Sequence, residues 1–351
     1  MSSNSSMSGI SLVVLMAMSA VMASTQADAA YRGAEVLPGG RDVVVGGVYW
    51  GAGASDPAVP HTLYIERIGG GERRVFKQFT GRITDFKAAP IGGLLAVNEV
   101  VRETGVSPDR ANVVTREYLN DRQVEFYDHL DSKLVILGAD GSVRGSISDV
   151  HRFAWDPEGE QVVYVTGTEN EDGYVVSSGT WIYDIGTRTS RRIHAAGDDV
   201  AWPDWDGNVY ISGQVLTSGR VGVVKHDPAT GVTTETSRKG IHFSPDGRHY
   251  FRGASEGDPG GEVFLTAGDV PVELDMAIEE SGRKGRAIAR GWFSSSQVIA
   301  ASAIPGAPVD YLIDVVTGSK QRLDGELLNP DGRSDRSWIL NGTSISERSL
   351  R

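Results

Sequence analysis

Short apolar runs separated by Gly, Pro, Asp and Asn fill most of the chain. A typical stretch is Phe153–Gly159 (FAWDPEG), which is followed by the apolar run Val162–Val165. Runs of this length that end at turn residues are typical of β-strands joined as antiparallel hairpins. The pattern therefore predicts an all-β protein.

One turn phrase recurs along the chain. Its clearest copy is Ile241–Phe251 (IHFSPDGRHYF), and further copies follow Phe153, Trp202 and Leu328. In this phrase Ser or Asp accepts backbone N–H groups, Pro presets φ, and Gly adopts the positive φ that closes the turn. The recurrence predicts a repeat fold, in which each unit supplies one small sheet.

A second phrase, apolar-apolar-Asp followed by Thr three residues later, comes after the first in several units. Its copies are Ile182–Thr187, Val224–Gly231 and Leu312–Gly318. The Asp carboxylate can accept local backbone N–H groups at such a turn. This phrase predicts the outer hairpin of a four-stranded unit.

Aromatic residues that start the units set the expected number of blades. The anchor aromatics are Phe86, Phe153, Trp202, Phe243 and Trp292, with weaker unit starts at Leu37 and Asn329. Their intervals are close to or longer than the roughly 40–45 residues of a propeller blade. We expect a single β-propeller of seven four-stranded antiparallel blades. Six is the alternative if the final unit merges with the first to close the ring.

Two segments depart from the strand pattern. Residues 102–127 form the longest insertion, in which Ser107 and Pro108 have the order of a helix N-cap and first turn. The segment Met276–Arg290 (MAIEESGRKGRAIAR) is rich in charge, and we expect a short helix or a charged loop there.

The first residues predict export. The apolar run Ile10–Ala23 precedes Ala27–Ala29, which has the form of a signal-peptide cleavage site. We expect residues 1–29 to be a signal peptide and residues 31–351 to form the propeller, in the periplasm or outside the cell. No later segment has the length of a membrane span, so no integral membrane segment is expected in the mature form.

Charge and cysteine content exclude several functions. The formal net charge is −12, so we expect no nucleic-acid partner, because binding phosphates requires an excess of Lys and Arg. The chain has no Cys, which excludes disulfides, a thiol nucleophile and Cys-based metal sites.

The phrase Phe243–Arg248 (FSPDGR) resembles the core of the TolB-like, WD40-like propeller repeats of exported bacterial proteins. It is also similar to the propeller domain of prolyl oligopeptidases and dipeptidyl peptidases. The resemblance implies the fold over about Val36–Leu350. Propellers host many unrelated activities, and no catalytic residue of either family is carried over.

Motif matches for catalysis or metal binding are incomplete. Gly253–Gly257 has the G-x-S-x-G form around Ser255, but Asp258 and Pro259 replace the helix that a nucleophile elbow requires. Asp204–Asn208 has only the opening spacing of a calcium loop. We predict no catalytic residue, no metal site and no cofactor, with Ca²⁺ bound by loop acids as the alternative.

These observations favour a non-catalytic binding or scaffolding module that meets a protein or a small ligand at the axial mouth. The insertion loop offers the expected contact residues, and exposed loops commonly carry binding residues. They are Tyr118, Phe126 and Tyr127, together with His129 just after the insertion. The alternative is an enzyme with a site in the central funnel, a hydrolase or lyase acting on an exported polymer or glycan. Whether the chain is an enzyme stays open, with the non-catalytic interpretation preferred.

Overall fold

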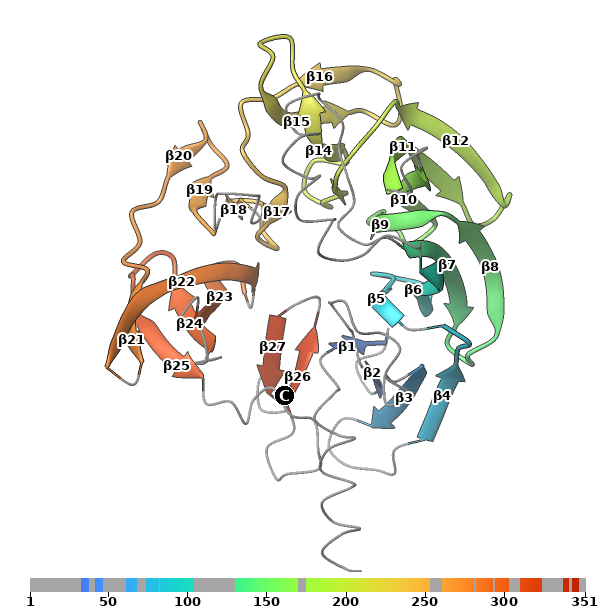
Figure 1. The fold of residues 1–351 in the computed structure, drawn as a ribbon, viewed down its shortest axis with the longest axis horizontal. Coiled ribbons are helices and arrows are strands. Elements are labelled where there is room, and N and C mark those ends of the chain that lie inside the picture. The colour runs from blue at the N-terminus through green and yellow to red at the C-terminus, as the bar shows by residue number, and fades with distance from the viewer. Residues whose placement is uncertain are drawn as a thin grey trace, which may run out of the picture.

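The strands of the chain form separate sheets arranged around a ring (Figure 1). The computed structural model describes residues 33–37, 42–46, 61–67, 74–81, 83–103, 130–169, 175–252, 261–280, 282–292, 294–302, 310–323, 337–340 and 343–346. Every regular element in these ranges is a β-strand. The expectation of an all-β propeller is confirmed, and all described strand pairs are antiparallel except that of β1 with β26.

The first sheet holds strands from both ends of the described chain. In spatial order they are β27 (Thr343–Ser346), β26 (Ser337–Leu340), β1 (Gly33–Val36), β2 (Asp42–Gly46), β3 (Thr62–Arg67) and β4 (Arg74–Gln78). β26 runs parallel to β1, with Leu340 opposite Ala34. This pairing closes the ring between its first and last strands.

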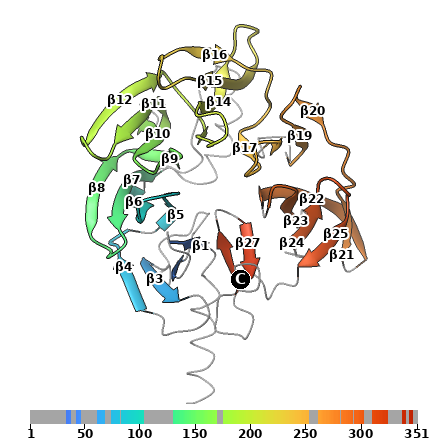
Figure 2. The ribbon, with the colours of Figure 1, turned by 180° about the vertical axis from the view of Figure 1, so that it is seen from behind.

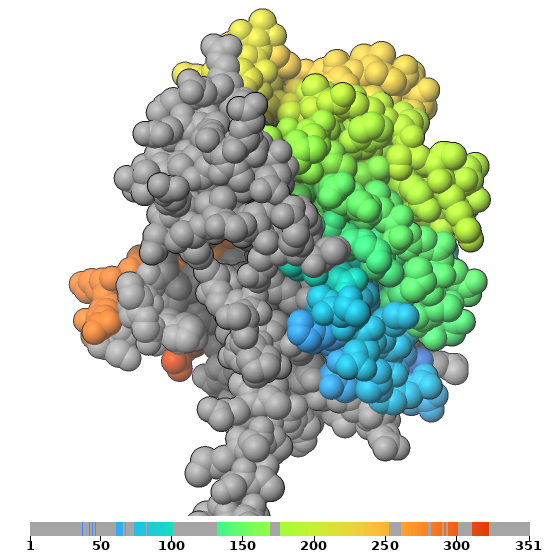
Figure 3. All heavy atoms as spheres, turned by 45° about the vertical axis from the view of Figure 1, so that its right-hand side comes forward, coloured from blue at the N-terminus to red at the C-terminus, as the bar shows by residue number. Residues whose placement is uncertain are grey.

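The next three sheets each consist of four antiparallel strands that follow one another along the chain. The second is β5 (Ile83–Ala88), β6 (Leu94–Glu103), β7 (Leu130–Gly138) and β8 (Val143–Ser148). The third is β9 (Val150–Trp155), β10 (Gln161–Glu169), β11 (Val175–Asp184) and β12 (Thr189–His194). The fourth is β13 (Val200–Ala201), β14 (Val209–Val215), β15 (Val221–His226) and β16 (Thr233–Glu235). Figure 3 shows the outer surface passing through these sheets in succession, from blue to yellow.

The last two sheets complete the ring (Figure 2). The fifth is β17 (His242–Phe243), β18 (His249–Phe251), β19 (Val263–Leu265) and β20 (Val270–Pro271). The sixth is β21 (Ala277–Glu280), β22 (Arg283–Trp292), β23 (Gln297–Ser302), β24 (Asp310–Asp314) and β25 (Lys320–Leu323).

The expected number of seven blades is not confirmed. The described strands group into six sheets. The hairpin of β26 and β27, which belongs to the final unit of the sequence, joins the first sheet through β1. Among the described strands, this is the arrangement expected for the six-blade alternative.

The expectation of a helix or charged loop at 276–290 is wrong. The segment forms the hairpin of β21 and β22, in which Glu280 pairs with Arg283. Gly282 in the turn has a φ of 75°, which an α-helix does not accommodate. Ile278 and Ala287 are buried in the core, whereas Glu279, Lys284 and Arg286 are exposed. Burial of these apolar positions outweighs the helix propensity of the Glu and Lys residues.

Each apolar core lies between two neighbouring sheets. Phe86 of the second sheet packs with Val44 and Leu63 of the first, and Phe153 of the third packs with Leu134 of the second. The same arrangement recurs between the later sheets. The anchor aromatics therefore hold adjacent sheets together, which is why the repeat places one in each unit.

The repeat turns form as the sequence predicts. The N–H of Gly247 donates to the Ser244 carbonyl over 2.9 Å, and the Ser244 hydroxyl donates to Asp246 over 2.8 Å. In the second phrase, the Asp184 carboxylate accepts the backbone N–H of Thr187 over 2.7 Å and its hydroxyl over 2.9 Å. The outer hairpins of the fourth and sixth sheets carry the same contact.

Candidate functional site

The first strands of successive sheets lie on the inner side of the ring. Figures 1 and 2 both show β1, β5, β9 and β17 there. Ionisable side chains gather on or beside the inner strands of the second to fifth sheets, and we name them the axial cluster. The cluster comprises Asp85, Lys87, Arg152, Asp198, Asp199 and His242.

Lys87 connects the second and third sheets. Its ammonium Nζ lies 3.4 Å from Oδ2 of Asp85 and donates to the carbonyl of Phe153 over 3.2 Å. The ammonium also lies 5.1 Å from the centroid of the Phe153 ring. In return, the indole N–H of Trp155 donates to the carbonyl of Lys87 over 2.9 Å. The position of Lys87 is thus fixed by contacts from two sheets.

The loop that carries Asp198 and Asp199 is held by a β-bulge in β14. The N–H of Asp198 donates to the carbonyl of Ser212 over 3.0 Å, and the N–H of Ser212 donates to the carbonyl of Asp199 over 2.9 Å. Gly213 in the bulge has a φ of 74°, and a Cβ atom there would lie 2.4 Å from Cβ of Asp198. Gly is required at this position because both the backbone and the approach of Asp198 exclude a side chain.

The two acids differ in their surroundings. Oδ1 of Asp199 accepts the N–H of Val200 over 2.8 Å. Among the described residues, none donates a hydrogen bond to the carboxylate of Asp198. Burial, together with the nearby charge of Asp199, raises the pKa of Asp198 to about 6, and Arg152 opposes this rise. Asp198 therefore titrates just below neutral pH.

His242 brings the fifth sheet to the cluster. Its ring stacks on Phe251 with centroids 4.7 Å apart, and its carbonyl accepts the indole N–H of Trp292 over 2.8 Å. Burial lowers the pKa of His242, the charge of Lys87 lowers it further, and the charge of Asp199 opposes both. The imidazole is therefore neutral at pH 7 and can either donate or accept a hydrogen bond.

The axial cluster combines two cations, three acids and a neutral imidazole. Such a set can bind a polar or charged ligand through several hydrogen bonds, and groups with shifted pKa values are characteristic of functional sites. Within the described ranges, no three His, Cys, Asp or Glu side chains have the geometry to hold a metal ion. Those ranges also contain no helix with the length and hydropathy of a membrane span.

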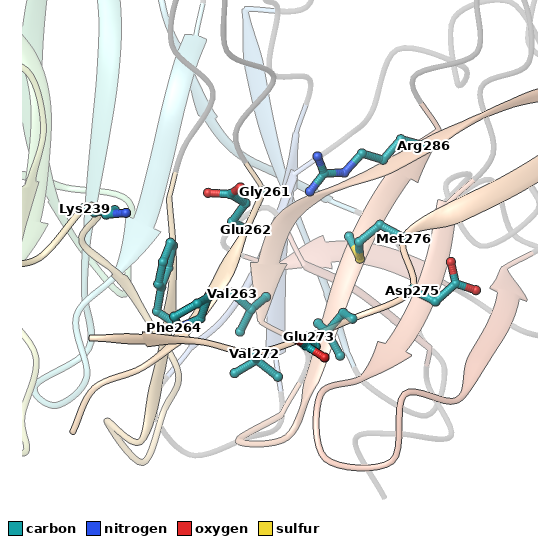
Figure 4. Close-up of a pocket in the computed structure, with 12 residues that line it drawn as sticks. Lys239, Gly261, Glu262, Val263, Phe264, Val272, Glu273, Asp275, Met276 and Arg286 are labelled. Carbon is teal, nitrogen blue, oxygen red and sulfur yellow. The ribbon is translucent and has the colours of Figure 1, made fainter. Parts of the chain in front are cut away.

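A separate groove of about 530 Å³ lies between the fifth and sixth sheets (Figure 4). Its lining includes Phe264, Val272 and Met276, with Lys239 and Arg286 among the charged residues. None of these residues belongs to the axial cluster. The axial cluster holds both Asp198, a carboxyl whose pKa is raised to about 6, and His242, an imidazole whose pKa is lowered, so it is the stronger candidate for the functional site.

The contact residues expected from the sequence lie outside the described residues. They are Tyr118, Phe126, Tyr127 and His129, and Ser255 also lies outside them. The ends of their loop are described: Glu103 at the end of β6 pairs with Leu130 at the start of β7. The insertion thus connects the second and third strands of the second sheet, whose first strand carries Asp85 and Lys87.

The residues around Asp206, whose spacing resembles the start of a calcium loop, form a turn. Oδ1 of Asp206 accepts the N–H of Asn208 over 2.9 Å, and Oδ2 accepts the hydroxyl of Tyr210 over 2.5 Å. Both carboxylate oxygens of Asp206 thus have a partner within its own sheet.

No residue of the axial cluster is among the site residues predicted from the sequence. A signal for it exists, since three of its members adjoin an anchor aromatic in the sequence, namely Lys87, Arg152 and His242. Charged or polar residues at the starts of successive repeat units meet at the axis once the ring closes. Asp198 and Asp199 precede the Trp202 anchor by a few residues. Their place in the cluster could be predicted only if the bulge at Gly213 were known.

Comparisons with known proteins assign no activity to the chain. No protein-family model matches the chain. Three similar solved structures are TolB from Acinetobacter baumannii (TM-score 0.48, 13% identity), acylaminoacyl peptidase from Pyrococcus horikoshii (0.46, 9%) and the WD40 domain of Pan2 from Neurospora crassa (0.39, 9%). They are the kinds of protein that the repeat phrase resembles. They cover 76%, 88% and 63% of this chain, which covers 61%, 47% and 59% of theirs. At these identities and TM-scores the likeness carries no argument about the activity of this chain.

One curated protein is similar in sequence. The large ribosomal subunit protein uL1 of Treponema denticola is 30% identical over 188 residues, which are 50% of this chain and 78% of that protein. By sequence alone this match groups half of the chain with uL1. A ribosomal role does not follow, because 34 Lys and Arg against 46 Asp and Glu leave an excess of negative charge, which RNA phosphates repel. We assign the fold from the described sheets, which form a propeller.

Proposed function

We propose that the chain is an exported, non-catalytic β-propeller that binds a protein or a small polar ligand at its axial mouth. One observation carries the proposal: the inner strands of four successive sheets bring ionisable groups into mutual electrostatic contact. Asp198 interacts with Asp199 and Arg152, and His242 interacts with Asp199 and Lys87.

The energetics of Asp198 support binding. A carboxylate that is partly buried without a hydrogen-bond donor lowers stability, because burial removes part of its hydration and no described residue replaces it. A ligand that donates hydrogen bonds to Asp198 removes this penalty. The site is thus prepared for a donor group, such as an amide, a hydroxyl or an ammonium.

Export rests on the sequence. The apolar run Ile10–Ala23 and the cleavage pattern Ala27–Ala29 support a signal peptide and a location in the periplasm or outside the cell. The absence of Cys is compatible with an oxidising compartment, since no thiol is exposed to oxidation there.

An enzyme is the second candidate function, and the pair Asp198 and His242 favours it. A carboxyl with a pKa of about 6 and a neutral imidazole are suited to proton transfer near neutral pH. A hydrolase or lyase of exported glycans would lose at least about 100-fold in rate in Asp198→Asn, which is the usual contribution of a general acid or base. Activity on a glycan panel that survives this substitution would exclude Asp198 from catalysis.

A thermal-shift screen of residues 31–351 against peptides, glycans and metal ions tests the binding proposal. A ligand at a hundredfold excess over its Kd stabilises the folded form by about 2.7 kcal/mol. We expect at least one hit whose shift is reduced in Asp198→Asn and retained in Glu158→Gln, which removes an exposed charge in a repeat turn. Hits that shift all three proteins equally would contradict binding at the axis, and so would a panel without hits.

A further inference from the structure

The groove between the fifth and sixth sheets has an apolar floor that remains partly exposed. Val272 and Leu274, which connect β20 to β21, pack against the core shared by the two sheets and are only partly buried. Beside them, the cross-strand pair Leu265 and Val270 is 40% and 49% exposed. Contiguous exposed apolar side chains of this kind mark contact sites on soluble proteins.

Two of the acids around the groove are already neutralised. Glu262 pairs with Arg252 over 3.1 Å. Asp275 accepts a hydrogen bond from the ammonium of Lys320 over 2.7 Å.

Two cations of the groove form no ion pair with the described residues. Lys239 lies over the Phe264 ring, 5.5 Å from its centroid, and is exposed. Arg286 is exposed and forms no ion pair within the described part of the chain. Figure 4 shows Lys239 and Arg286 toward opposite ends of the groove, with Val263, Val272 and Met276 between them. Since Glu262 and Asp275 are paired, Lys239 and Arg286 outnumber Glu273, the remaining acid of the lining, on a chain with a net charge of −12.

We propose that this groove is a second binding site, distinct from the axial cluster, for an extended peptide segment that carries carboxylates beside an apolar side chain. The apolar side chain covers Val272 and Leu274, and the carboxylates meet Lys239 and Arg286. Glu273 on the lining disfavours an acid at its own position and so fixes the direction of the segment.

Charge complementarity selects this occupant over others. A basic peptide is attracted to the whole acidic surface without preference for the groove, whereas an acidic peptide is attracted only beside cations, and at Lys239 and Arg286 an apolar recess adjoins the cations. The volume of about 530 Å³ is within the range of sites that enclose one or two large side chains.

The test is a selection of random dodecapeptides displayed on phage, with the full chain as target and counter-selection on the Lys239→Glu/Arg286→Glu variant. We expect enriched sequences that place Asp or Glu within three residues of Leu, Ile, Phe or Met. For the best peptide, the Kd measured by fluorescence anisotropy should rise at least fivefold in Arg286→Glu. It should stay within twofold in Arg220→Glu, which reverses an exposed charge in the β14–β15 hairpin.

The outcomes separate this site from the axial one. Asp198→Asn should leave the peptide affinity unchanged, so failure of the axial proposal does not affect this test. Absence of enrichment, a consensus without carboxylates, or equal affinities for Arg286→Glu and Arg220→Glu would overturn the proposal. A third outcome is that octanoate, a simple alkyl carboxylate, displaces the peptide and the selection shows no residue preference. This outcome would identify a small-molecule site and overturn the peptide assignment.

Discussion

Gly247 and Trp205 are in contact across the boundary between the fourth and fifth sheets: a Cβ atom at Gly247 would lie 2.5 Å from the indole ring. Gly247 also has a φ of 68°, so it serves both its own turn and the packing of the neighbouring sheet. The turn phrase of the sequence thus has a second role that its local chemistry does not reveal.

Replacing Gly247 by Ala should therefore be more destabilising than the same change at a similar turn. Gly231 has a φ of 74° and open space around its Cβ position, so Gly231→Ala reports backbone strain alone. Overpacking adds about 1–3 kcal/mol, and Gly247→Ala should exceed Gly231→Ala by at least about 1 kcal/mol in urea denaturation. Equal losses would show that the indole moves aside without cost.

Arg238 should stabilise the same boundary. Its guanidinium lies 5.4–6.0 Å from the ring centroids of four aromatic residues, and it pairs with Asp269 over 3.4 Å. Both charged side chains are 14% exposed. Arg238→Met keeps the aliphatic packing but leaves Asp269 without its cation, and we expect a loss of about 2–4 kcal/mol in the free energy of unfolding. Arg238→Met/Asp269→Asn should recover part of that loss. A double variant no more stable than the single one would contradict the pairing.

The stability of the fold should depend on the ionisation of Asp198. Its pKa rises from 3.8 to about 6 on folding, so the folded chain holds this proton more tightly than the unfolded chain. The contribution of protonated Asp198 to the free energy of unfolding is fully present below about pH 4 and is lost as the pH rises through about 6. Asp198→Asn cannot ionise, so it should exceed wild type by about 2–3 kcal/mol at pH 8 and match it at pH 4. A difference that does not vary with pH would contradict the raised pKa.

The insertion should be removable without loss of the fold. Because Glu103 pairs with Leu130, the ends of residues 104–129 are neighbours, and an Asn-Gly turn can join them. We expect the thermal midpoint to change by less than about 2 °C, since the second sheet keeps its four strands. Axial ligand binding should weaken if Tyr118, Phe126, Tyr127 and His129 contact the ligand. Unchanged affinity would exclude those four residues from the site.

Local turn chemistry made much of the fold predictable. The side chains of Ser244, Asp246 and Asp184 bond within a few residues of themselves, so their positions in the sequence suffice to predict their hairpins. The anchors Phe86 and Phe153 were equally predictable, because each is a large apolar side chain that packs against the preceding sheet.

What escaped prediction depends on contacts between units. The hairpin at β21 and β22 forms because Ile278 and Ala287 are buried against other strands, which the charged sequence around them conceals. The merging of the last hairpin with β1, which the sequence offered only as the six-blade alternative, is a pairing across nearly the whole chain. The axial cluster likewise exists only because sheets brought together by ring closure place Asp198, Arg152 and His242 near one another.

Protection of an engineered cysteine tests binding at the axis most directly. The chain has no cysteine, so a single substitution gives a unique thiol whose reaction with maleimide can be followed. Asp85→Cys reports the axial cluster, and Val221→Cys, at a site 60% exposed on β15, reports the outer surface. With a ligand from the thermal-shift screen at a hundredfold excess over its Kd, axial binding predicts labelling at least tenfold slower at position 85 and unchanged at position 221. Unchanged labelling at position 85 would contradict it.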